Sequence, residues 1–214
     1  MMLAALAMCC LAPKVVCIDP GHPSDVGLGT RGKRLTEVAV AWEIAKSLRE
    51  RLTARSVQVV LTKSAEREFV RNLDRSAIAN RARADLFVRL HCDAAAGSGF
   101  AVYYPSQAGT SHGKTGPSAA VLANSKQAAT RFRAAMSRRL RSAHRDNGLK
   151  TDLATAVGAR QGALTGSIFS EVPVLLVEMC VLTNPRDEAW IGSREGRHLM
   201  VDALTEATVA ALAE

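Results

Sequence analysis

Short apolar runs rich in branched and aromatic residues predict five β-strands along the chain. In the first run Val15, Val16 and Ile18 flank Cys17, a pattern that suits a strand buried on both faces of a parallel sheet. The five predicted strands are Val15–Ile18, Val57–Thr62, Leu86–His91, Phe100–Tyr104 and Val172–Leu182.

The segments between the strands repeat apolar residues at helical spacing. Ala41, Ile44, Ala45, Leu48 and Leu52 share one face of a predicted helix at Leu35–Ala54 that Thr36 can cap. Phe69, Leu73 and Ala77 mark a second helix, and two more are predicted at Ser125–Ala143 and Glu195–Leu212. Pro105–Pro117, rich in Gly, Ser and Thr, reads as an exposed loop. Alternating strands and helices predict a three-layer α/β/α fold with a mostly parallel sheet.

Composition narrows the class of protein. With 214 residues and 48% hydrophobic residues, the chain can bury one large core, which favours a single domain over residues 14–214. The net charge of +8 favours an anionic partner, such as a wall polymer. Aromatic residues make up only 4% and do not alternate with basic ones, so nucleic acid is not an expected partner.

The first 13 residues form a short apolar stretch, MMLAALAMCCLAP. It is shorter than the roughly 20 residues needed to cross a bilayer, so no transmembrane segment is expected. It reads as the remnant of an export signal or as a disordered apolar end. Met8 before Cys9 is a poor match to a lipoprotein cleavage site. Because this stretch is interpreted as an export signal, we expect an exported protein of the periplasm or cell wall.

Residues that can bind metal or move protons follow three of the strands. His22, His91 and Glu178 each close a strand, and Glu37 stands in the first turn of the helix after the first strand. Because parallel strands end at the same edge of a sheet, all four side chains can converge there. The two histidines and Glu37 also have a plain structural explanation, since histidines at strand ends are often only hydrogen-bonded and a glutamate favours any helix N-terminus. Glu178 differs, because a carboxylate that closes an apolar strand must be paired, metal-bound or solvated in a cleft.

Convergence of these side chains would support metal-assisted hydrolysis. Two imidazoles and one carboxylate can hold Zn²⁺ and leave a position for water, whose pKa the metal lowers to about 7. A further carboxylate, Glu178, could take a proton from that water and pass it to an amine leaving group. The same ligand set also suits non-haem Fe(II), and a non-catalytic envelope protein is another alternative.

At this point the chain resembles the zinc-dependent N-acetylmuramoyl-L-alanine amidases, which cut peptidoglycan. The matching motifs occur in the family's order: DPGH at 19–22, a helix-opening Glu37, LTK at 61–63, RSAIAN at 75–80, ADLFVRLHCD at 84–93, NGLKTD at 147–152 and VPVLLVEMCVLTNPRDE at 172–188. The resemblance implies a twisted six-stranded sheet flanked by helices. It also implies Zn²⁺ on His22, Glu37 and His91, with Glu178 as the catalytic acid and base.

The resemblance further implies a peptidoglycan substrate, a glycan strand with stem peptides. We expect a monomer. An activator protein or an anionic wall polymer is expected as a further partner. The alternative function is that of a non-catalytic or partner-regulated peptidoglycan-binding protein on the same fold. The chain departs from the family at Cys92, Asp93 and Cys180, which affects pocket shape rather than the ligands. Because Phe100–Ser125 is short and polar, we expect no inhibitory helix over the metal.

Overall fold

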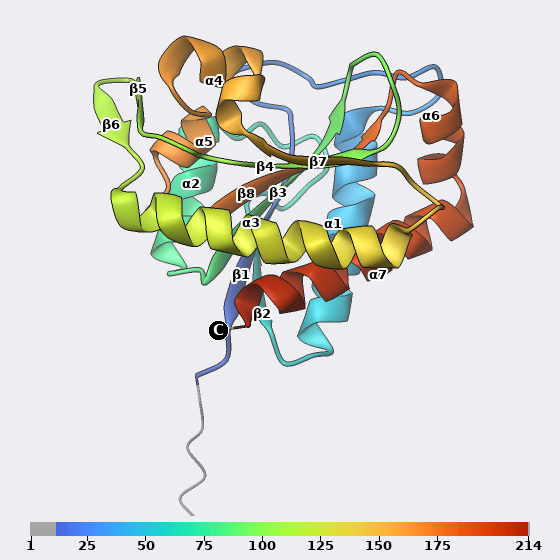
Figure 1. The fold of residues 1–214 in the computed structure, drawn as a ribbon, viewed down its shortest axis with the longest axis horizontal. Coiled ribbons are helices and arrows are strands. Elements are labelled where there is room, and N and C mark those ends of the chain that lie inside the picture. Colours follow the sequence, from blue (N-terminus) through green and yellow to red (C-terminus); the bar gives the residue numbers. More distant parts are fainter. Residues whose placement is uncertain (1–11, 214) are drawn as a thin grey trace, which may run out of the picture.

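A six-stranded sheet organises the computed structural model, which describes residues 12–213 (Figure 1). The strand order is β2-β1-β3-β8-β4-β7. All neighbouring pairs are parallel except β4 and β8, which are antiparallel. The strands are β1 (Val15–Pro20), β2 (Gln58–Leu61), β3 (Leu86–Asp93), β4 (Phe100–Tyr104), β7 (Asp146–Thr151) and β8 (Val174–Val181). The predicted mostly parallel sheet is confirmed.

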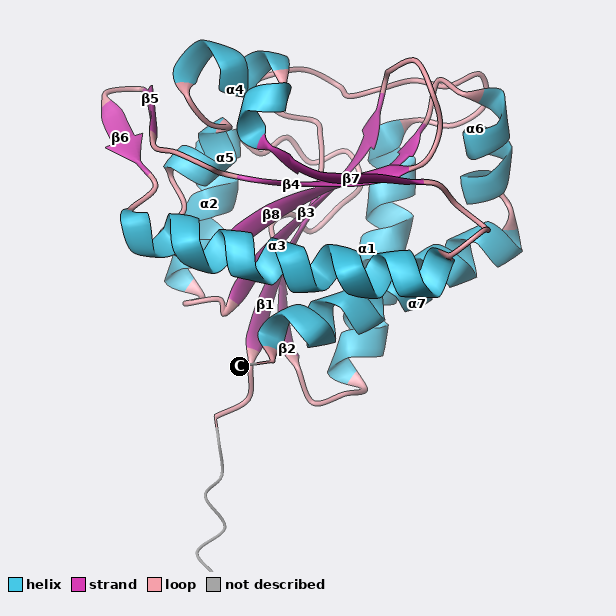
Figure 2. Ribbon diagram, viewed as in Figure 1, coloured by secondary structure: helices cyan, strands magenta, loops and turns pink. Residues whose placement is uncertain are grey.

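Helices cover both faces of the sheet, which confirms the three-layer architecture (Figure 2). One face packs against α1 (Glu37–Thr53), α3 (Ala119–Leu140) and α7 (Arg194–Leu212). The other face carries α2 (Asn72–Arg81) and the short α5 (Thr165–Ile168). The remaining elements are the hairpin β5 (Gly109–Ser111) and β6 (Lys114–Gly116), η1 (Asp152–Ala154), α4 (Ala156–Gln161) and α6 (Pro185–Gly192).

The main hydrophobic core lies between the sheet and α1, α3 and α7. Ile44 and Leu48 of α1 and Phe132 and Met136 of α3 are buried there against the strands. Fully burying an aliphatic or aromatic side chain of this size contributes roughly 1.5–3 kcal/mol. This core holds the central strands in place. The candidate site lies on the other face of these strands, at their carboxyl ends.

Local capping explains most element boundaries. Thr36 caps α1 as predicted, its hydroxyl accepting a hydrogen bond from Ala39 N at 3.3 Å. The long helix begins at Ala119, not near Ser125, because the Ser118 hydroxyl caps it at Val121 N. It ends at Leu140 because Arg141 adopts a positive φ of 39°.

Four other predictions from the hydrophobic pattern were wrong in detail. Phe69 lies outside α2 and is 59% exposed, so it does not mark that helix's buried face. The segment predicted as a loop contains the β5–β6 hairpin. Strands β3 and β8 continue past His91 and Glu178, which therefore lie within strands rather than at their ends.

The N-terminal expectations lie largely outside the described residues. The proposed export remnant at 1–13, including Cys9 and Cys10, falls mostly within residues 1–11, which the structure does not describe. Across residues 12–213, no helix combines the length and apolar character needed to cross a membrane.

Candidate functional site

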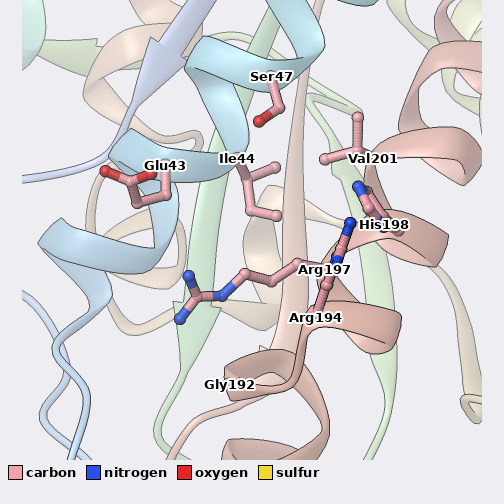
Figure 3. Close-up of a pocket in the computed structure, with 8 residues that line it drawn as sticks. All are labelled: Glu43, Ile44, Ser47, Gly192, Arg194, Arg197, His198 and Val201. Atoms are coloured by element: carbon pink, nitrogen blue, oxygen red, sulfur yellow. The ribbon is translucent and has the colours of Figure 1, made fainter.

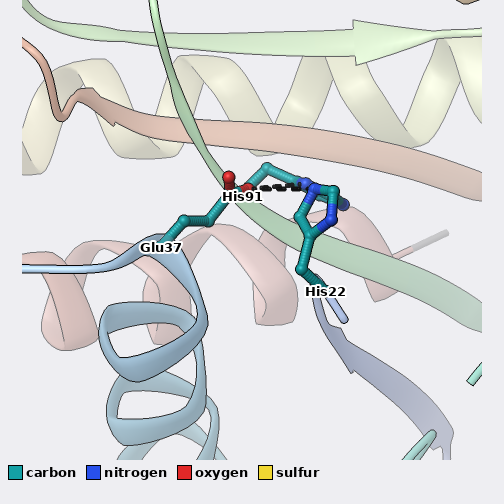
Figure 4. Close-up of side chains that lie close together, drawn as sticks. All are labelled: His22, Glu37 and His91. Carbon is teal, nitrogen blue, oxygen red and sulfur yellow. Dashed lines mark hydrogen bonds and ion pairs between the residues drawn. The ribbon is translucent and has the colours of Figure 1, made fainter. Parts of the chain in front are cut away.

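His22, Glu37 and His91 come together at the carboxyl ends of adjacent parallel strands. His22 follows β1, His91 lies in β3, and Glu37 is the first residue of α1, which starts where the β1 exit loop ends. One potential ligand atom from each residue lies within 4.8 Å of the others. Figure 4 shows the two imidazoles and the carboxylate pointing toward one another. The predicted convergence of these three residues is confirmed.

The backbone around His22 is shaped to present its ring. His22 adopts a φ of 53°, a left-handed conformation that is costly for a non-glycine residue and that gathers at functional sites. Its Nδ1 atom lies 3.0 Å from the carbonyl oxygen of Gly27, and its Nε2 atom lies 3.7 Å from Oε1 of Glu37. The Gly27 contact orients the ring so that Nε2 faces the cluster.

Glu37 is a buried carboxylate held in its ionised form. Its Oε1 atom lies 2.8 Å from His91 Nδ1 and accepts a hydrogen bond from Cys92 N at 3.1 Å. Its Oε2 atom accepts a hydrogen bond from Thr30 N at 2.6 Å. Burial alone would raise the pKa of Glu37, but His91, His22 and the Thr30 amide lower that pKa to about 2.

His91 is enclosed and kept neutral. Burial lowers the pKa of its imidazole, which outweighs the opposite effect of Glu37. Within residues 12–213 its buried Nε2 atom has no hydrogen-bond partner. A carboxylate beside two imidazoles, at least one held neutral, is the protonation state that metal ligands require. The donor set and the unpartnered ring nitrogen therefore fit a divalent metal ion.

Glu178 lies next to this cluster on β8. It is the register partner of His91, so the two side chains share one face of the sheet. Burial, reinforced by the negative charges of Glu37 and Asp93, raises the pKa of Glu178 well above its usual range. Its enclosed Oε2 atom has no hydrogen-bond partner in the part of the chain that is described. A buried carboxyl group whose pKa is raised by burial and by neighbouring charges is a candidate for proton transfer.

A buried ionic network centred on Asp19 supports the backbone that carries His22. The Asp19 carboxylate accepts hydrogen bonds from Thr62 Oγ1 at 2.5 Å, from Arg89 Nε at 2.9 Å and from Arg75 Nη1. Arg75 also donates to the carbonyl oxygens of Pro20 and Pro23, each at 2.8 Å. These bonds fix the backbone on both sides of His22.

Lys63 is a further support that the sequence analysis noted only as part of a motif. Its ammonium group donates to the carbonyl oxygen of His22 and, at 2.8 Å, to that of Glu66. Burial lowers the pKa of Lys63 to about 8. The sequence signal for this role is the LTK motif, which places Lys63 two residues after β2.

The residues that depart from the family pattern have different surroundings. Cys92 is buried in the main core and is absent from the metal cluster that the described residues form, as expected from its alternation with His91. A hydrogen bond with Cys180, together with burial, raises the pKa of the Cys92 thiol. Asp93 is partly exposed and contributes negative charge beside Glu178.

A separate hollow of about 400 Å³ lies where α1, α6 and α7 meet (Figure 3). It is lined by Glu43, Ile44, Ser47, Gly192, Arg194, Arg197, His198 and Val201. None of the four candidate residues lines it, and α1 and α7 cover the face of the sheet opposite to Glu178. The candidate residues therefore lie at the strand ends and not in this hollow.

Gly21 allows the close approach between the β1 exit and the ring of His91. A Cβ atom at this position would lie 2.6 Å from His91 Cε1 and 2.8 Å from Nδ1. We expect Gly21→Ala to displace His91 and to weaken divalent metal binding by about 10-fold or more, the range found when ligand orientation is disturbed. Titration with zinc against a competing chelator measures this effect.

Gly192→Ala provides the matched control for that experiment. A Cβ atom at Gly192 would meet only Leu35 Cδ1, at 3.3 Å, and none of the three cluster residues. We expect metal affinity to be unchanged in this variant. Equal metal affinity in Gly21→Ala and the wild type would show that the contact with His91 does not position a ligand.

Comparison with known proteins assigns the chain to a family of enzymes. The Amidase_3 family, whose description is N-acetylmuramoyl-L-alanine amidase, matches residues 16–210. The chain belongs to this family. All four candidate residues, together with Asp19, Lys63 and Arg75, fall within the matched range.

Individual amidases resemble this chain in sequence or in fold. The chain is 28% identical over 199 residues to N-acetylmuramoyl-L-alanine amidase LytC of Bacillus subtilis, covering 92% of this chain and 35% of LytC. Among solved structures, the amidase Ami1 from Mycobacterium smegmatis superposes with a TM-score of 0.76 at 24% identity, covering 94% of this chain and 97% of Ami1. The CwlD amidase from Clostridioides difficile, in complex with the GerS lipoprotein, gives a TM-score of 0.72 at 16% identity, covering 93% of this chain and 98% of CwlD. The chain spans 27–35% of the length of the curated relatives that it matches.

Proposed function

We propose that this chain is a zinc-dependent hydrolase that cleaves the amide bond between N-acetylmuramic acid and L-alanine in peptidoglycan. The observation that carries the proposal is the His22, Glu37 and His91 cluster with Glu178 beside it on the same face of the sheet. Membership of the Amidase_3 family supports the same bond as the target.

In this proposal His22, Glu37 and His91 would hold Zn²⁺, which when bound would supply a water of lowered pKa and polarise the carbonyl of the bond to be cut. Glu178 accepts a proton from the attacking water and delivers it to the alanine nitrogen as that amine leaves. Burial and the charges of Glu37 and Asp93 raise the pKa of Glu178, which favours its holding the proton that it then delivers to the leaving amine. The Thr30 and Cys92 amides hold Glu37 in place throughout.

The domain and location of the protein are part of the same proposal. Residues 14–214 form one catalytic domain that acts on the cell wall after export. The proposal includes a protein partner, because the structurally similar CwlD amidase was solved in complex with the GerS lipoprotein. An anionic wall polymer remains a proposed partner because of the net charge of +8. Two arginines of α3 are less available to bind it, because Arg133 pairs with Asp146 and Arg139 pairs with Asp202.

Product analysis tests the proposed function. The zinc-loaded chain is incubated with purified peptidoglycan, and the released fragments are identified by mass spectrometry. We expect stem peptides that begin with a free alanine amine, and glycan strands with intact lactyl carboxyl groups. Binding to peptidoglycan without any cleavage would instead favour a non-catalytic wall protein, and activity with Fe(II) but not with zinc would favour an iron enzyme.

A further inference from the structure

We propose that Lys150 binds a carboxylate of the stem peptide on the amine side of the bond that is cut. The inference rests on the proposed amidase function and assigns a substrate contact to one residue. It follows from the position of Lys150 in a row of side chains that crosses the sheet from the metal cluster to the edge strand β7.

Strand register places this row on one face of the sheet. Glu178 on β8 is the partner of His91 on β3 and of Ala101 on β4. Tyr103, two residues beyond Ala101, shares its face and lies diagonally across from Glu178. Tyr103 is in turn the register partner of Lys150 on β7. The row therefore runs from His91 through Glu178 and Tyr103 to Lys150.

Contacts with Tyr103 hold the ammonium group of Lys150. Its Nζ atom lies 3.5 Å from the Tyr103 hydroxyl oxygen and 5.5 Å from the centre of the Tyr103 ring. In residues 12–213 no carboxylate forms an ion pair with Lys150, which is partly exposed. A cation that is oriented by an aromatic ring but lacks an acidic partner can accept an external carboxylate.

The charges along the row match the polarity of the proposed substrate. Burial, reinforced by the charges of Glu178 and Asp93, raises the pKa of Tyr103 to about 12, so the hydroxyl stays neutral and Lys150 is the cationic end of the row. The leaving alanine amine would be at the Glu178 end. On the sugar side, the lactyl carboxyl group of muramic acid is itself consumed in the amide bond, so the carboxylates nearest to that bond belong to the stem peptide.

The distances along the row suit the residue that follows alanine. Lys150 is two strand spacings across the sheet and two residues along the strands from Glu178, about 12 Å at roughly 4.8 Å per strand and 3.3 Å per residue. An extended peptide advances about 3.5 Å per residue, so the carboxylate of the second residue is about 7 Å from the alanine nitrogen. The lysine side chain covers the remaining distance. The contact is therefore expected with the α-carboxylate of an acidic second residue.

Two matched substrates test this contact. Both are N-acetylmuramoyl-L-alanyl-D-glutamate with the γ-carboxyl group blocked as a methylamide, and they differ only in the α-group, which is a free carboxylate or a carboxamide. We expect the zinc-loaded wild type to cleave the acid with a KM about 10-fold lower than that of the amide. In Lys150→Met the KM for the acid should rise to the value for the amide, with kcat within about 2-fold of the wild type.

Control variants separate binding from a structural role. Lys150→Arg keeps the charge and should retain most of the preference for the acid. Lys126→Met, which removes an exposed lysine on α3, should leave both KM values unchanged. If Lys150→Met lowered activity on both substrates equally, or if the wild type did not distinguish them, the inference would be overturned while the amidase function stood.

Failure of the amidase function itself gives a different result. If the wild type cleaves neither substrate, the proposed function fails, and calorimetry on the zinc-loaded Glu178→Gln variant decides the Lys150 contact by binding alone. We expect this variant to bind the acid about 10-fold more tightly than the amide, and to lose that difference when Lys150→Met is added. Equal affinities in that experiment would overturn the inference.

Discussion

Replacing Glu178 by glutamine is expected to reduce kcat for peptidoglycan cleavage by two to four orders of magnitude while zinc stays bound. Glutamine keeps the size of the side chain but cannot accept or deliver a proton, and a positioned acid–base group typically contributes 10²–10⁴ in rate. The substitution also removes a carboxyl group from beside Glu37 and Asp93, where like charges raise the pKa of Glu178. Folding stability should therefore be equal to or higher than that of the wild type.

The measurement compares turnover and bound metal in the same preparations. Turnover is followed by release of peptides with a free alanine amine, and bound zinc is counted by elemental analysis. Asp93→Asn is the matched control, because it removes a nearby carboxylate that has no proton-transfer role in the proposal; a reduction in kcat of less than about 10-fold is expected. Glu178→Gln with near wild-type turnover would remove the acid–base role from Glu178 and turn attention to Asp93.

The sequence predicted the hydrophobic strands, including β2 at one edge of the sheet, better than the more polar strand at the other edge. Strands β1, β3, β4 and β8 are hydrophobic enough to be recognised directly, and each was predicted within a few residues of its observed bounds. Strand β7 was not predicted from the pattern, because every one of its six residues, DNGLKT, is partly exposed and it lies at the sheet edge. Only the family resemblance implied a sixth strand. The antiparallel pairing of β4 with β8 was also not deduced, since pairing direction depends on the path of the connecting chain.

The site was predictable where it depends on strand order and less so where it depends on tertiary contacts. Placing His22 and His91 near the same sheet edge needed only the parallel arrangement of β1 and β3. The exposure of Phe69 and the contact between Tyr103 and Lys150 depend on residues that are distant in sequence and have no periodic pattern. The support that Asp19 gives to the β1 exit belongs to the same class, because its arginine partners come from α2 and β3.

Asp19→Asn is expected to lower the free energy of unfolding by about 3–5 kcal/mol at pH 7. Asp19, Arg75 and Arg89 are buried, and removing one member of a buried ion group leaves uncompensated charge inside the protein. Burial alone would raise the pKa of Asp19, but the two arginines and the Thr62 hydroxyl bring it well below its usual range. The matched control is Glu43→Gln, which breaks an exposed pair with Lys46 and should change stability by less than about 1 kcal/mol.

The dependence on pH distinguishes this charge effect from a simple packing defect. A carboxylate whose pKa is lower in the folded state than in the unfolded chain contributes stability above its unfolded pKa of about 3.9, and that contribution is lost as pH falls toward the folded pKa. The difference in unfolding free energy between the wild type and Asp19→Asn should therefore be constant from pH 7 to about pH 5 and decrease below about pH 4. Urea denaturation in chelator-containing buffer at each pH measures this difference without a contribution from zinc. A difference that stays the same down to pH 3 would mean that shape rather than charge at Asp19 supports the loop carrying His22.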